Sequence, residues 1–154
     1  MKMSEELKKA QANMQPGVIS VQGFLGSDTR PIVDIIQHDE EAFRLFGLEW
    51  EAVGAKLREL LKKGSDGLGE PTTVANRWLI RVDETRGTLP SPWEDGIFHK
   101  VNAEVQLLAA GQRVGNPLIY NELCIHLLEK FHFLQGKGSP FRLEPATLKE
   151  VLGF

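Results

Sequence analysis

The sequence has one cysteine, Cys124, one tyrosine, and no long run of apolar residues. A single cysteine excludes an intrachain disulfide and is typical of a reducing compartment, so we expect a cytoplasmic protein. No stretch approaches the roughly 18 apolar residues that a membrane-spanning helix needs. The N-terminal segment carries charges throughout, unlike a secretory signal. We therefore expect a soluble protein with no membrane partner.

Neither sign of charge dominates the chain. It has 18 Lys and Arg residues against 21 Asp and Glu residues, a net charge of −3. This balance gives no general attraction to a polyanion, so no nucleic-acid partner is expected. With 154 residues, 42% of them hydrophobic, the chain can bury one core without a metal or cofactor. Together these values indicate one globular domain, 1–154.

The first half of the chain has mainly helical periodicity. Residues 1–16 predict a short peripheral amphipathic helix that ends at Pro16-Gly17. The segment 17–64 predicts a strand at 18–24, rich in β-branched residues, followed by a helical hairpin. Its two helices, 31–46 and 48–63, each have one apolar stripe, and Asp28 or Thr29 is expected to cap the first.

The second part, 72–154, begins with a change of hydrophobic period from 3.6 to 2, which is typical of half-buried strands. It predicts a β-meander, a long loop, a fourth helix from Asn121 with its inner face extending to Leu134, and a short last helix. The expected segments are a strand at 73–82, a loop at 84–96, a strand at 97–107, a return strand at 114–120 and a helix at 145–152. Pro117 places the return strand at a sheet edge. The pattern therefore predicts an α+β fold, with a small antiparallel sheet and a single layer of amphipathic helices on one face.

A basic glycine-containing loop, GKGSPFR, follows the fourth helix. Its glycines allow backbone N–H groups to turn inward as an anion-binding nest, and Lys137 and Arg142 would add positive charge. The sequence-based candidate site for an anionic ligand consists of Lys137, Gly138, Ser139, Arg142, His132 and His99. Structural capping of the preceding helix is the alternative reading of the same glycines and lysine.

The four histidines and Cys124 are the residues whose side chains could supply imidazole or thiolate metal ligands or catalytic groups. His126 and His132 are six residues apart and do not share a helix face, so no local metal motif is present and no metal is predicted. Cys124 lies on an apolar helix stripe, where a thiol is an inert buried group. A long-range site that combines His99 with one of the helix histidines stays open, because the hairpin and the fourth helix are expected to pack together; ordinary half-buried histidines are the alternative.

Three functional hypotheses follow. The first is a binding or regulatory module that uses the GKGSPFR loop for a small anionic ligand or a protein partner. The second is an enzyme with histidine acid–base chemistry, through His99, His126 or His132, between the hairpin and the fourth helix. The third is a protein–protein interaction subunit, for example a homo-oligomer, that uses the N-terminal helix or the loop around Trp93 as its contact.

Overall fold

The computed structural model describes residues 3–154. In this part of the chain, five helices pack with one antiparallel sheet that has the strand order β1-β2-β3-β4. The helices are α1 (Glu5–Asn13), α2 (Ile32–Phe46), α3 (Trp50–Ser65), α4 (Glu122–Phe131) and α5 (Pro145–Leu152). The strands are β1 (Thr72–Val74), β2 (Trp78–Pro90), β3 (Ile97–Ala109) and β4 (Gln112–Asn121). The predicted α+β meander is thus confirmed.

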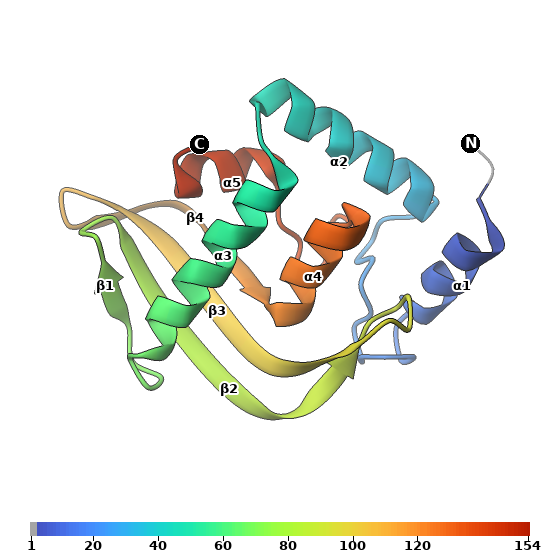
Figure 1. Cartoon of the computed structure of the whole chain (residues 1–154), viewed down its shortest axis with the longest axis horizontal. Helices are drawn as coiled ribbons and strands as arrows, with labels where there is room; N and C mark the ends of the chain where they lie inside the picture. Colours follow the sequence, from blue (N-terminus) through green and yellow to red (C-terminus); the bar gives the residue numbers. More distant parts are fainter. Residues whose placement is uncertain (1–2) are drawn as a thin grey trace.

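The sheet is strongly curved, and the helices lie on its concave side. The long strands β2 and β3 bend around α3 and α4, while α5 lies near β4 and α2 lies farther from the sheet (Figure 1). Inward-facing residues on β2 and β3, such as Ile80 and Val105, are fully buried. Their neighbours Arg81 and Glu104 are exposed on the helix-free face, as the alternation of side chains in a strand requires.

Helix α4 connects two apolar clusters. Cys124, Ile125 and Leu128 pack with α3 and the sheet, whereas Leu123 and Leu127 pack with α1 and α2. A helix that is apolar over so much of its circumference is buried on more than one side. Because both clusters share α4, the described chain is a single α+β domain. Among the described residues, no helix is long and apolar enough to cross a bilayer.

Helix α1 is docked and supplies the cap of α2. Ala10 and Met14 of α1 are buried, and the Gln11 side-chain oxygen accepts a hydrogen bond of 2.9 Å from the backbone N–H of Ile32. The predicted capping of α2 by Asp28 or Thr29 is wrong: the residue before α2 is Pro31, and it makes no side-chain cap. A distant glutamine satisfies the helix N-terminus, which local spacing could not reveal.

The strand predicted at 18–24 is wrong. This segment consists of turns and bends, and its β-branched Val18 and Val21 are 57% and 88% exposed. Gly17 and Gly23 adopt positive φ, which interrupts an extended chain. The segment makes no pairing with the sheet. β-Propensity alone was therefore a poor guide, because a strand also needs a pairing partner.

Two boundaries in the meander also differ from prediction. The predicted single strand at 73–82 is a hairpin, in which β1 pairs with the start of β2 around Ala75 and Asn76, both with positive φ. The predicted loop at 84–96 is mostly strand: β2 continues to Pro90, with an irregularity between Glu84 and Thr88. The true loop is limited to 91–96. As predicted, Pro117 lies on an edge strand, β4.

The fourth helix ends earlier than predicted. It stops at Phe131, because His132 adopts a left-handed conformation with φ of 55°. Leu134 is therefore outside the helix, although its side chain is buried.

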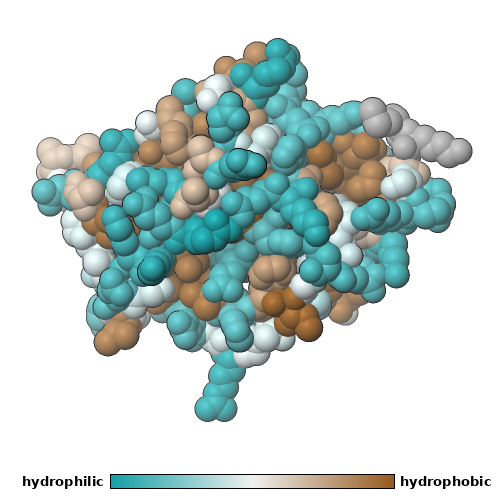
Figure 2. All heavy atoms as spheres, viewed as in Figure 1, coloured by the Kyte–Doolittle hydropathy of each residue, from teal (hydrophilic) through white to brown (hydrophobic). Residues whose placement is uncertain are grey.

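The outer surface over α3 and α4 is mainly hydrophilic, with scattered apolar patches (Figure 2).

Candidate functional site

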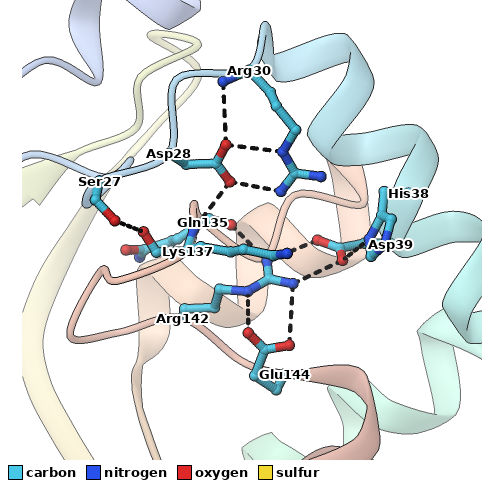
Figure 3. Close-up of polar contacts among 9 residues, drawn as sticks. All are labelled: Ser27, Asp28, Arg30, His38, Asp39, Gln135, Lys137, Arg142 and Glu144. Carbon is cyan, nitrogen blue, oxygen red and sulfur yellow. Dashed lines mark hydrogen bonds and ion pairs between the residues drawn. The ribbon is translucent and has the colours of Figure 1, made fainter.

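The GKGSPFR loop contacts a carboxylate from the same chain. The backbone N–H of Lys137 donates to Oδ2 of Asp28 at 3.1 Å, and Arg30 holds the same carboxylate through Nε at 2.9 Å and Nη2 at 2.6 Å (Figure 3). The hydrogen bond from Arg30 is the largest effect on Asp28 and lowers its pKa well below the usual range, although burial opposes it. The segment around Asp28 thus docks on the loop as an internal anion.

Arg142 is buried at the other side of this loop. Its side chain is 4% exposed, and its guanidinium makes a two-pronged contact with Asp39, both distances being 2.9 Å. The same group donates to Glu144 Oε1 and to the Gln135 carbonyl oxygen, each at 2.7 Å (Figure 3). Burial lowers the pKa of Arg142, but both carboxylates raise it, and the net pKa is above its usual value. Arg142 therefore joins α2 to the start of α5 as a permanent cation.

The remaining residues of the loop have different surroundings. The Ser139 hydroxyl is buried and donates to Gln135 Oε1 at 2.5 Å. Gly138 has a φ of 89°, and the Lys137 side chain is exposed, with no ion pair to another described residue. Of the cations expected at an anion site, only Lys137 is thus presented to solvent. Ligand binding by the loop stays a prediction.

The predicted histidines do not gather at one place. His132 is stacked on Trp50 at 4.1 Å between ring centroids, and its Nδ1 lies 2.7 Å from Glu40. His99 is exposed on β3, and strand alternation turns it away from the side of its neighbour Phe98. Neither makes a described contact with the GKGSPFR loop.

His126 is placed differently, on α4 beside the β2–β3 loop. Its Nε2 lies 2.8 Å from Oδ2 of Asp95, and the same oxygen accepts from Lys130 at 3.0 Å. Burial raises the pKa of Asp95, but hydrogen bonds from Ser91, Lys130 and His126 lower it to about 2. The carboxylate is therefore ionised at neutral pH and acts only as an acceptor.

This contact determines the tautomer of His126. Because ionised Asp95 can only accept, Nε2 of the neutral imidazole carries the proton, and Nδ1 retains the lone pair. A carboxylate that orients an imidazole in this way is a recurrent feature of acid–base sites. The His126 side chain remains 22% exposed, so it is accessible.

His126 lies in the wall of a groove between α3, α4 and β3. We name this space the α3–α4 groove. It has a volume of about 260 Å³ and is lined by Arg58, Leu61, Phe98, Glu122, Ile125, His126 and Glu129. A space of this size accepts a single-ring organic molecule and combines an apolar base with a few polar groups, as binding sites do.

The polar residues of the groove come from two turns of α4 and one position on α3. Glu122 precedes His126 by four residues, so both project from one helix face. Glu129 accepts from Arg58 of α3, with Nη2 2.5 Å from Oε1. Gly54 of α3 makes room for this contact, because a Cβ there would lie 2.5 Å from the Glu129 side chain.

Other surface hollows lack comparable chemistry. Those of about 320, 400 and 470 Å³ beside α1, beside the end of α3 and along the segment 25–30 are larger, but none is lined by a histidine. In the largest, Asp28 and Arg30 already satisfy one another. The α3–α4 groove is therefore the candidate site.

Sequence reasoning identified only part of this site. It named His126 and the space between the hairpin and the fourth helix, but it did not identify Asp95, Glu122, Glu129 or Arg58. The four-residue spacing of Glu122 and His126 was a usable signal. Asp95 could not be found, because its role depends on where the 91–96 loop lies.

Cys124 is a buried free thiol on α4. Burial raises the pKa of the Cys124 thiol to about 12, outweighing hydrogen bonds that lower it, so the protonated form dominates at neutral pH. Within residues 3–154, no group of three or more His, Cys, Asp and Glu side chains is arranged to hold a metal ion.

Comparison with known proteins returned no match: no family model fits the chain, and no curated protein or solved structure shows significant similarity to it.

Proposed function

We propose that the protein binds a small organic molecule in the α3–α4 groove, and that His126 accepts a hydrogen bond or a proton from this molecule. The observation that carries the proposal is the 2.8 Å contact between His126 Nε2 and Asp95, which leaves Nδ1 as the free acceptor of an accessible imidazole. Leu61 and Ile125, 8% and 2% exposed, supply an apolar surface beside it. This is the combination that holds a ring and orients its polar substituent.

The GKGSPFR loop supports a ligand site less well. Its Lys137 N–H is already bonded to Asp28, and the guanidinium of Arg142 is bonded to Asp39 and Glu144. An incoming anion would have to displace these internal carboxylates. The groove has no such competitor at His126, because Asp95 contacts only the opposite nitrogen of its ring.

Benzyl alcohol is a suitable neutral probe, since it combines one ring with one hydroxyl donor. We expect the full chain to bind it with millimolar affinity, the usual range for so few atoms. His126→Phe should weaken binding about tenfold, because it keeps a ring beside Phe98 but removes the acceptor nitrogen. Ligand-observed NMR titration measures both dissociation constants.

The matched control is His99→Phe, which changes an exposed histidine on β3 that does not line the groove. It should leave the dissociation constant within a factor of two. Asp95 keeps its contacts with Ser91 and Lys130 in the His126 variant, and thermal unfolding checks that the fold is retained. Equal affinities for wild type and His126→Phe, or equal losses in both variants, would refute the proposed role.

A further inference from the structure

We infer that the ligand of the α3–α4 groove is a cation with a small apolar body, such as a primary amine attached to a ring. This inference rests on the proposed function and adds the chemical class of the ligand. It follows from how the charges in and beside the groove are paired, from where the unpaired charge lies, and from the apolar surface next to it.

The cations at the groove are already engaged. Arg58 donates two hydrogen bonds to the Glu129 carboxylate, at 2.5 and 3.3 Å, and this contact raises the pKa of Arg58, so its guanidinium stays charged. Beside the groove, Nζ of Lys130 lies 3.0 Å from Oδ2 of Asp95. With both cations neutralised by carboxylates of the chain, neither is free to attract an anionic ligand.

Glu122 is the remaining charge in the lining. It lines the groove half-buried and makes no ion pair or side-chain hydrogen bond with another described residue. It projects from the first turn of α4. Because Arg58 and Lys130 are each paired with a carboxylate of the chain, Glu122 leaves one unpaired carboxylate charge in the described lining of the groove. An ammonium group complements this charge, and a carboxylate or phosphate is repelled by it.

The rest of the groove fits the body of such a ligand. Leu61 and Ile125 are apolar, and the Phe98 ring, with its centroid 4.7 Å from that of His126, offers an aromatic surface. Aromatic faces also attract cations. Since Glu122 and His126 are one helical turn apart, one ammonium can donate to the carboxylate and to Nδ1 of the imidazole. Glu122 thus determines the preference for a cationic ligand, and His126 accepts a second hydrogen bond from the ammonium group.

Three probes of nearly equal shape test this assignment: benzylamine, benzyl alcohol and benzoate, each titrated into the full chain at pH 7 and low salt. We expect benzylamine to bind at least tenfold more tightly than benzyl alcohol, and benzoate to bind more weakly than either. Glu122→Gln should reduce the preference for benzylamine to within about twofold. Glu51→Gln, which removes a carboxylate from the first turn of α3 instead, should preserve it.

The possible outcomes distinguish an error in the cation assignment from an error in the proposed binding site. If benzyl alcohol or benzoate binds in the groove as tightly as benzylamine, or if Glu122→Gln leaves the preference unchanged, the cation assignment is wrong while the groove remains a binding site. If none of the three probes binds, both the assignment and the proposed function are wrong. Thermal unfolding of Glu122→Gln confirms that a lost preference does not reflect a lost fold.

Discussion

Asp39→Ala is expected to lower the free energy of unfolding by about 3–5 kcal/mol. Asp39 is fully buried on α2, and its carboxylate accepts both prongs of the Arg142 guanidinium, which is itself only 4% exposed. Removing the acid leaves a buried cation whose remaining partners are the exposed Glu144 and the Gln135 carbonyl, and breaking a buried pair in this way costs far more than the intact pair contributes. Chemical denaturation at pH 7 measures the change.

Glu41→Ala is the matched control, because it removes a carboxylate from the same helix. Glu41 pairs with Arg44 on the exposed face, and pairs of this kind contribute less than about 1 kcal/mol. A loss for Asp39→Ala as small as that for Glu41→Ala would show that the Arg142 contact is not buried as described. The double variant Asp39→Leu, Arg142→Leu should lose less than the sum of the single variants, since it removes both buried charges of this pair and the Glu144 carboxylate that also loses Arg142 is 53% exposed to water.

Gly26→Ala is expected to destabilise the protein by about 3 kcal/mol. Gly26 has a φ of 57°, which is unfavourable for any residue with a Cβ by about 1–2 kcal/mol. A Cβ would also lie 2.3 Å from the backbone nitrogen of Ser139 and 2.5 Å from the carbonyl oxygen of Lys137. The segment around Asp28 would therefore have to move off the GKGSPFR loop, at a further cost of about 1–3 kcal/mol.

Gly47→Ala separates these two effects. Gly47 ends α2 with a similar φ of 68°, but a Cβ there meets no atom within 4 Å. It should lose about 1 kcal/mol, the conformational part alone. Equal losses for the two variants, measured by thermal or chemical unfolding, would contradict the close packing of the segment on the loop.

The helices were predictable from sequence, because each carries its own signal. The apolar stripes of α2 and α3, the Asn121 cap of α4 and Pro145 at the start of α5 are all local features that the structure reproduces. The α+β class followed from the change of hydrophobic period after 72. The errors came where a local pattern was ambiguous: β-branched residues at 18–24 without a pairing strand, and a polar stretch at 84–90 that pairs with β3.

The site was less predictable, because it depends on contacts between distant residues. The anion-binding groups of the GKGSPFR loop were recognised, but the sequence could not show that Asp28, 109 residues earlier than Lys137, reaches them. Likewise, Asp95 and His126 are 31 residues apart and meet only because the β2–β3 loop folds over α4. Motif spacing detects ligands on one element, whereas these partners lie on different elements.

The central claim is that the α3–α4 groove is the ligand site of this protein. Methyl chemical-shift mapping of the full chain with benzyl alcohol tests it most directly. The account predicts that the largest shifts fall on Leu61 and Ile125, whose side chains line the groove. Shifts confined to exposed Val18 and Val21, or the absence of saturable shifts at the groove methyls, would contradict it.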